Sequence, residues 1–140
     1  MAINVKSVLT SGLVAGAVIC VSAITMVPVV GNQMDAVLSA RGLPPLSNMD
    51  MIFFTFISFI FGMALMFLYA VLKPHFGLRT KSAVMAALTV WVLAYLTSNA
   101  SLAVYGFMPV KLVVIGTIWG LMELLLAGMV GSRIYRDPII

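Results

Sequence analysis

Charged side chains are scarce in this 140-residue chain: 9% of the residues are Asp, Glu, Lys or Arg, whereas 63% are hydrophobic. Soluble domains carry roughly 25% charged and about 45–50% apolar residues. A disordered chain needs low hydrophobicity and high charge, and a soluble protein of this size could not remove so much apolar surface from water. The composition therefore excludes both classes and indicates the interior of a lipid bilayer.

Residues that bind metals or form disulfides are also scarce, with one cysteine, Cys20, and one histidine, His75. A lone cysteine cannot form an intrachain disulfide, and a lone histidine excludes a site built from several histidine ligands. The eleven methionines do not cluster with either residue, so we interpret them as packing. We predict no metal site and no cofactor.

Four apolar runs are each long enough to cross a bilayer, which takes about 20 residues at 1.5 Å per residue. They are residues 7–30, 51–72, 82–105 and 109–132. Every backbone polar group must be satisfied inside hydrocarbon, so these runs predict helices. The first run follows Lys6 as in a signal peptide, but it is too long for a signal sequence, and we expect a retained anchor.

The connectors predict how these helices are arranged. Residues 73–81 form a short basic turn with Pro74 and Gly77 as breakers, and residues 105–109 form another short turn. Short connectors make sequential helices antiparallel neighbours. We therefore predict an all-α fold, an integral membrane bundle of four transmembrane helices running up-down-up-down, as a single domain over residues 1–140.

The basic residues lie at the ends of the apolar runs instead of on one face, which argues against nucleic-acid binding and indicates membrane topology. Six of the eight belong to one side and two to the other. The six are Lys6, Lys73, Arg79, Lys81, Arg133 and Arg136, and the two are Arg41 and Lys111. Because cytoplasmic loops carry the excess of Lys and Arg, we predict that both termini are cytoplasmic.

The long connector, residues 31–50, is then external. Asn32 could cap a short helix that Gly42 ends. This pattern predicts a short helix on the outer membrane surface, and an ordered loop is the alternative. Ser47 or Asn48 could cap the second span.

Small residues on the predicted helices indicate where the backbones approach closely, because packing and polar contacts, not burial, join helices in lipid. The predicted packing residues are Gly12, Gly16, Gly62, Gly116, Gly120 and Gly131. The third span carries its own small stripe, made of Ala83, Ala87, Ala94, Ser98 and Ser101.

Glu123 is the one acid inside a span and lies near its middle. A charge at that depth costs at least ~2.5–3.5 kcal/mol, so we expect a neutral carboxyl hydrogen-bonded to Tyr95 or to a backbone carbonyl. The candidate intramembrane polar site comprises Glu123, Tyr95, Trp91, Asn99 and Ser58. We favour a role in fixing helix register, because a transport path needs further polar residues along it.

The whole chain resembles a family of uncharacterised small bacterial four-helix integral membrane proteins. The resemblance is carried by Gly12–Gly16 (GLVAG), by Tyr69–Phe76 ending in Lys-Pro-His-Phe, and by Trp119–Glu123 (WGLME) with Gly128 and Tyr135. It implies a multi-pass protein of the bacterial inner (plasma) membrane and places Glu123 in a shared motif. It implies no particular activity.

Two functions fit this sequence. The first is a non-catalytic structural or accessory subunit that packs in a homo-oligomer or a larger membrane complex. The alternative is a small oligomeric proton-coupled transporter or channel that uses Glu123. An enzyme would need a nucleophile–base pair or a metal cluster, and the sequence contains no such pattern, so we predict no catalytic residue. The expected surroundings are the lipid bilayer and no nucleic acid.

Overall fold

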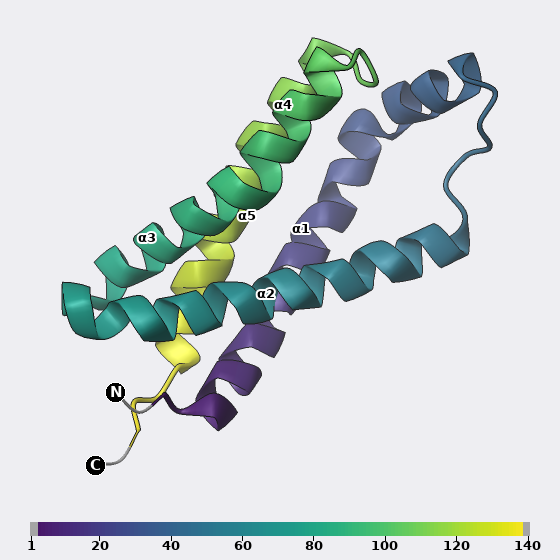
Figure 1. Ribbon diagram of the computed structural model, residues 1–140. Coiled ribbons are helices and arrows are strands. Elements are labelled where there is room, and N and C mark those ends of the chain that lie inside the picture. Colours follow the sequence, from purple (N-terminus) through teal and green to yellow (C-terminus); the bar gives the residue numbers. More distant parts are fainter. Residues whose placement is uncertain (1–2, 139–140) are drawn as a thin grey trace.

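The computed structural model describes residues 3–138 and is helical, without strands, over that range (Figure 1). Its elements are α1 (Val5–Ala40), α2 (Asn48–Phe76), α3 (Arg79–Val90), the π-helix η1 (Trp91–Leu96), α4 (Thr97–Val104) and α5 (Val110–Ile134). Since α3, η1 and α4 are continuous, the chain has four long helices, each apolar and long enough to cross a membrane. The prediction of an all-α chain with four span-length helices is confirmed.

The second helix begins and ends as its sequence indicates, with one difference. The Ser47 hydroxyl oxygen accepts the Asp50 backbone N–H at 3.3 Å, and Asp50 Oδ2 accepts the Ser47 N–H at 2.7 Å, which is a capping box. Gly77 ends the helix with a φ of 69°, a conformation that favours glycine. Pro74 does not break the helix, because α2 continues to Phe76.

The predicted surface helix is not a separate element. Residues 32–40 are helical, but they are the last turns of α1, so Asn32 caps nothing. Gly42, with a φ of 68°, follows the end of this helix as predicted. At 1.5 Å per residue the 36 residues of α1 extend about 54 Å, well beyond a hydrocarbon core of about 30 Å. Pro28 lies inside α1, and beyond it the helix bends in Figure 1, as expected at proline.

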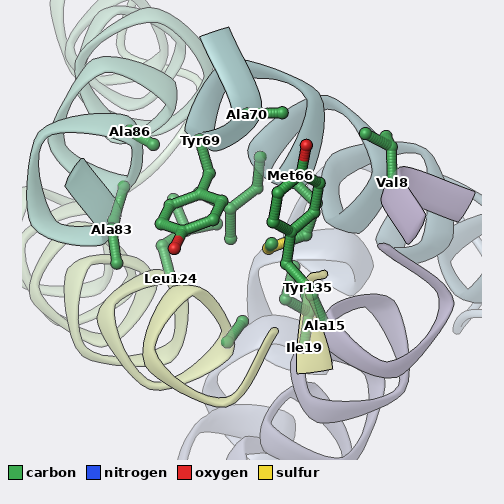
Figure 2. Close-up of a cluster of buried hydrophobic side chains, with 13 residues drawn as sticks. Val8, Ala15, Ile19, Met66, Tyr69, Ala70, Ala83, Ala86, Leu124 and Tyr135 are labelled. Carbon is green, nitrogen blue, oxygen red and sulfur yellow. The ribbon is translucent and has the colours of Figure 1, made fainter. Parts of the chain in front are cut away.

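The four helices pack tightly at one end only. We call this the closed end: residues 5–19, 58–76, 79–90 and 120–134. Figure 2 shows its core, where Tyr69 and Met66 of α2 face Leu124 of α5 and Ile19 of α1. All the buried apolar residues of the described chain lie there or directly after it, except Val30 and Leu112.

The opposite end is open. We call residues 20–40, 48–57, 91–104 and 110–119 the open end; η1 and α4 contribute no buried residue to the described structure. Neither α1 nor α2 packs against α4, and in Figure 1 α2 diverges from α4 and α5. Arg41, directly after α1, donates to the Gly106 carbonyl oxygen in the connector after α4 at 2.8 Å. Three α2 phenylalanines at this end, Phe53, Phe54 and Phe56, are each more than half exposed.

Glycines make the closed end possible. A Cβ placed on Gly62 would overlap the backbone of α1 at Gly12 and Gly16, and a Cβ on Gly16 would lie 2.8 Å from the Phe59 Cα. Real Cβ atoms do not approach so closely, so α1 and α2 cross backbone to backbone. Among the other predicted packing glycines, Gly131 faces Met66 closely, whereas Gly116 meets only the Asn99 side chain at 3.8 Å.

The segment after α5 bonds to the first turns of α1 and to the last turn of α2 at the closed end. The Arg136 backbone N–H donates to the Ser7 hydroxyl oxygen at 2.6 Å, which joins the end of the chain to the start of α1. Lys73 pairs with Asp137 at 2.6 Å and lies over the Tyr135 ring. Burial raises the pKa of Tyr135. The membrane side on which this end lies stays a prediction.

Candidate intramembrane polar site

Glu123 lies inside the bundle, on the face of α5 that meets η1. Its exposed fraction is 4%, and the Tyr95 hydroxyl donates a hydrogen bond to its Oε1. Tyr95 is one of the two partners that the sequence allowed for a neutral carboxyl. A buried polar group without a partner costs free energy in hydrocarbon, so the bond from η1 lets α5 hold an acid at this depth.

A glycine next to Glu123 makes room for its partner. Gly120 lies one turn earlier on α5, and a Cβ there would overlap the Tyr95 ring. The ring therefore lies directly on the α5 backbone while its hydroxyl reaches the carboxyl. The Tyr95 ring also packs against Phe61 of α2, and the centroids of the two rings are 5.9 Å apart. Three helices thus meet at Tyr95.

The π-helix decides which residues of the third span face α5. In an α-helix, residues three, four or seven positions apart lie on the same face, which predicts the stripe of Ala94, Ser98 and Ser101. The wider i→i+5 turn of η1 inserts one residue, so the facing positions shift by one, to Tyr95 and Asn99. Ser98 and Ser101 are exposed. The outer part of the predicted stripe therefore does not face α5 within this chain, and a contact of Ser98 and Ser101 with another subunit stays a prediction.

Two more predicted site residues also bond to α5. The Trp91 indole Nε1–H donates to the Thr117 carbonyl oxygen at 2.8 Å, and the Asn99 Nδ2 donates to the Thr117 hydroxyl at 3.0 Å. The side chains of Trp91, Tyr95 and Asn99 therefore all extend from η1 and α4 and form hydrogen bonds to α5. Sequence reasoning missed Thr117, although its position three residues before Gly120 was a usable signal.

A second tie reaches Glu123 from α1. The Trp119 Nε1–H donates to the Ser22 hydroxyl oxygen at 3.0 Å, and Ser22 also neighbours the Glu123 carboxyl. Ser22 was not among the predicted site residues.

Ser58 does not join this cluster. Its hydroxyl donates to the Phe54 carbonyl oxygen of its own helix at 2.9 Å. It lines a separate, mostly apolar pocket of about 180 Å³ between α1 and α2, together with Cys20 and Thr55. Over residues 3–138 no three His, Cys, Asp or Glu side chains lie close enough together to hold a metal ion.

Comparison with protein-family models, with curated proteins and with solved structures found no match to this chain. The class of the protein therefore follows from its helices alone: four long apolar helices indicate a multi-pass membrane protein. The particular bacterial family suggested by the sequence motifs stays a prediction.

Proposed function

We propose that this chain is a non-catalytic subunit of the bacterial inner membrane, with both termini cytoplasmic, that works by packing against another membrane helix. The observation that carries this proposal is how the polar residues are used. Trp91, Tyr95, Asn99 and Glu123 are all engaged in bonds between helices of the same chain. Groups committed to holding the bundle together are unsuited to binding a substrate.

The open end is where such a partner would dock. Its α2 segment lies away from α4 and α5, as described above, and the exposed face of that segment is rich in phenylalanine. Aromatic side chains give large contact areas at a helix interface. A second copy of the chain or a larger complex would fill this space, and the two occupants are distinguished by the mass of a crosslinked product.

Photocrosslinking tests the docking position. A benzophenone amino acid would replace Phe56, which is 64% exposed at the open end, or Phe67, which is 54% exposed at the closed end of the same helix. We expect a discrete protein adduct from position 56 and only lipid adducts from position 67. Equal protein adducts from both positions, or none from either after purification in mild detergent, would contradict the proposal.

A transporter that uses Glu123 is the second candidate, and one observation favours it. The π-helix η1 faces the carboxyl directly through Tyr95, and π-turns occur frequently at functional sites. A carboxyl that could release Tyr95 would be able to exchange a proton, as membrane carboxyls do in pumps and transporters.

Glu123→Gln separates the two functions. Glutamine keeps the size of the side chain and an oxygen that accepts the Tyr95 hydrogen bond, but it cannot exchange a proton. The subunit function predicts a modest loss of thermal stability or assembly and unchanged proton flux in proteoliposomes. The transporter function predicts full assembly and a proton flux that the wild type shows and the variant lacks.

A further inference from the structure

A basic pocket lies at the closed end, between the first turns of α1 and the segment that follows α5. It is open on one side and has a volume of about 740 Å³. Its polar lining consists of Asn4, Lys6, Ser7, Thr10, Arg133 and Arg136. The position is at the end of two spans, so the pocket lies where a membrane protein meets the lipid headgroups.

The described lining of the pocket concentrates positive charge and contains no acidic side chain. Three cations line it. Among residues 3–138 the one ion pair is Lys73–Asp137, and the remaining acids of the chain are distant: Asp35 and Asp50 flank the connector at the open end, and Glu123 lies mid-helix. Three like charges brought together without an acidic side chain among them indicate an anionic ligand.

The pocket is held in shape before any ligand arrives. Ser7, which is 7% exposed, accepts the Arg136 N–H. The Asn4 side chain accepts the Ser7 N–H at 3.1 Å and donates to the Arg136 carbonyl oxygen at 3.3 Å. These bonds fix the Arg136 backbone beside the start of α1, where the positive end of the helix dipole adds to the attraction for an anion.

The surroundings select among anions. Exposed apolar residues continue from the pocket along the lipid-facing side of each helix, with Leu9 and Leu13 on α1 and Val130 on α5. At helical spacing, Leu9 and Leu13 share a face with Lys6, and Val130 shares one with Arg133. A ligand with a negative headgroup and long alkyl chains matches both the basic pocket and the apolar surface beside it. A free inorganic anion would contact only the basic pocket.

We propose that this pocket binds the phosphate headgroup of an anionic phospholipid. Basic pockets between transmembrane helices on the cytoplasmic side are suited to such headgroups, and each Lys or Arg near an anionic surface raises affinity about fivefold. The inference goes beyond the proposed function, since it concerns the other end of the bundle and holds whether or not a partner docks at the open end.

Lipid titration in mild detergent, followed by native mass spectrometry, tests the site. The probes are phosphatidylglycerol, zwitterionic phosphatidylcholine and inorganic phosphate. We expect one phosphatidylglycerol bound per chain in preference to phosphatidylcholine, and no displacement by millimolar phosphate. The double variants Lys6→Gln/Arg133→Gln and Lys6→Gln/Arg136→Gln should each weaken phosphatidylglycerol binding by roughly 30-fold, because two charges are removed.

The matched control is Arg79→Gln/Lys81→Gln, which removes two charges from the same end of the bundle but outside the pocket. It should leave phosphatidylglycerol binding unchanged. Circular dichroism of each variant checks the helix content, and the two pocket variants serve as alternatives if one loses its fold. Equal weakening in the control, equal binding of phosphatidylcholine, or displacement by inorganic phosphate would each overturn the proposal.

Discussion

The closed and open ends of this bundle are built from the same four apolar helices, yet the buried core lies almost entirely at the closed end. At the closed end, Gly12, Gly16 and Gly62 let α1 and α2 touch backbone to backbone, and alanines of α3 lie against α5. At the open end, α2 carries exposed phenylalanine side chains, and the third span contains the wide turn of η1. The difference teaches that hydrophobicity places these helices in lipid, whereas small residues decide where they meet.

The largest effect should come from Gly62→Val. The added side chain would enter the α1 backbone, so the closed end must separate, and we expect a loss of about 3 kcal/mol or more. Unfolding in SDS–detergent mixtures, followed by circular dichroism, measures this loss. Gly31→Val is the matched control at the open end, where a Cβ would meet only Val27 at 3.6 Å. Similar losses in both variants would refute the contrast between the two ends.

Gly120→Ala should be the next largest. Its Cβ would overlap the Tyr95 ring, and overpacking of this kind costs about 1–3 kcal/mol. Gly116→Ala adds the same atom one turn earlier, where the nearest neighbour is Asn99 at 3.8 Å, and alanine there should stabilise the helix by up to about 1 kcal/mol. The same unfolding assay should therefore give opposite signs, and a loss in both would contradict the tight packing of Tyr95 on α5.

Tyr95→Phe tests the hydrogen bond to Glu123, which lies at the boundary between the closed and open ends. It removes the hydroxyl that donates to Glu123 but keeps the ring, and hydrogen bonds between membrane helices average about 0.6 kcal/mol with a maximum near 1.7 kcal/mol. Combining it with Glu123→Leu, which removes the acceptor, in a double-mutant cycle isolates this bond. A coupling energy of zero would show that the two side chains act independently. Tyr105→Phe, in the exposed connector before α5, should have no effect.

The smallest effect should come from Asp137→Asn. The variant breaks the ion pair with Lys73. The Lys73 side chain is 19% exposed and that of Asp137 is 64% exposed, and ion pairs exposed to this degree contribute at most about 1 kcal/mol. The loss measured by thermal melting should shrink as salt is added, because salt screens exposed charges. A loss that is independent of salt would indicate that Asp137 acts through packing instead.

The predictions from sequence succeeded where one helix could be considered alone. The four spans, the Ser47 cap and the Gly42 terminus follow from local composition, and the burial of the stripe from Gly120 to Gly131 follows from a regular α-helical period in α5. One prediction failed, because residues 32–40 continue α1 instead of forming a separate surface helix. The π-turn of η1 places Tyr95 and Asn99 toward α5 and leaves Ser98 exposed.

The amino-acid sequence by itself determined that this chain forms four membrane-length helices, because apolar runs of that length must satisfy their own backbone hydrogen bonds. It also determined that one acid would lie deep among them. Only the tertiary structure decided that Tyr95, of the two partners the sequence allowed, bonds to this acid, that Ser22 lies beside it, that Ser58 lies elsewhere, and that one end of the bundle is more open than the other. Those outcomes depend on crossing positions and on a π-turn, and both arise from contacts between distant segments that no local pattern encodes.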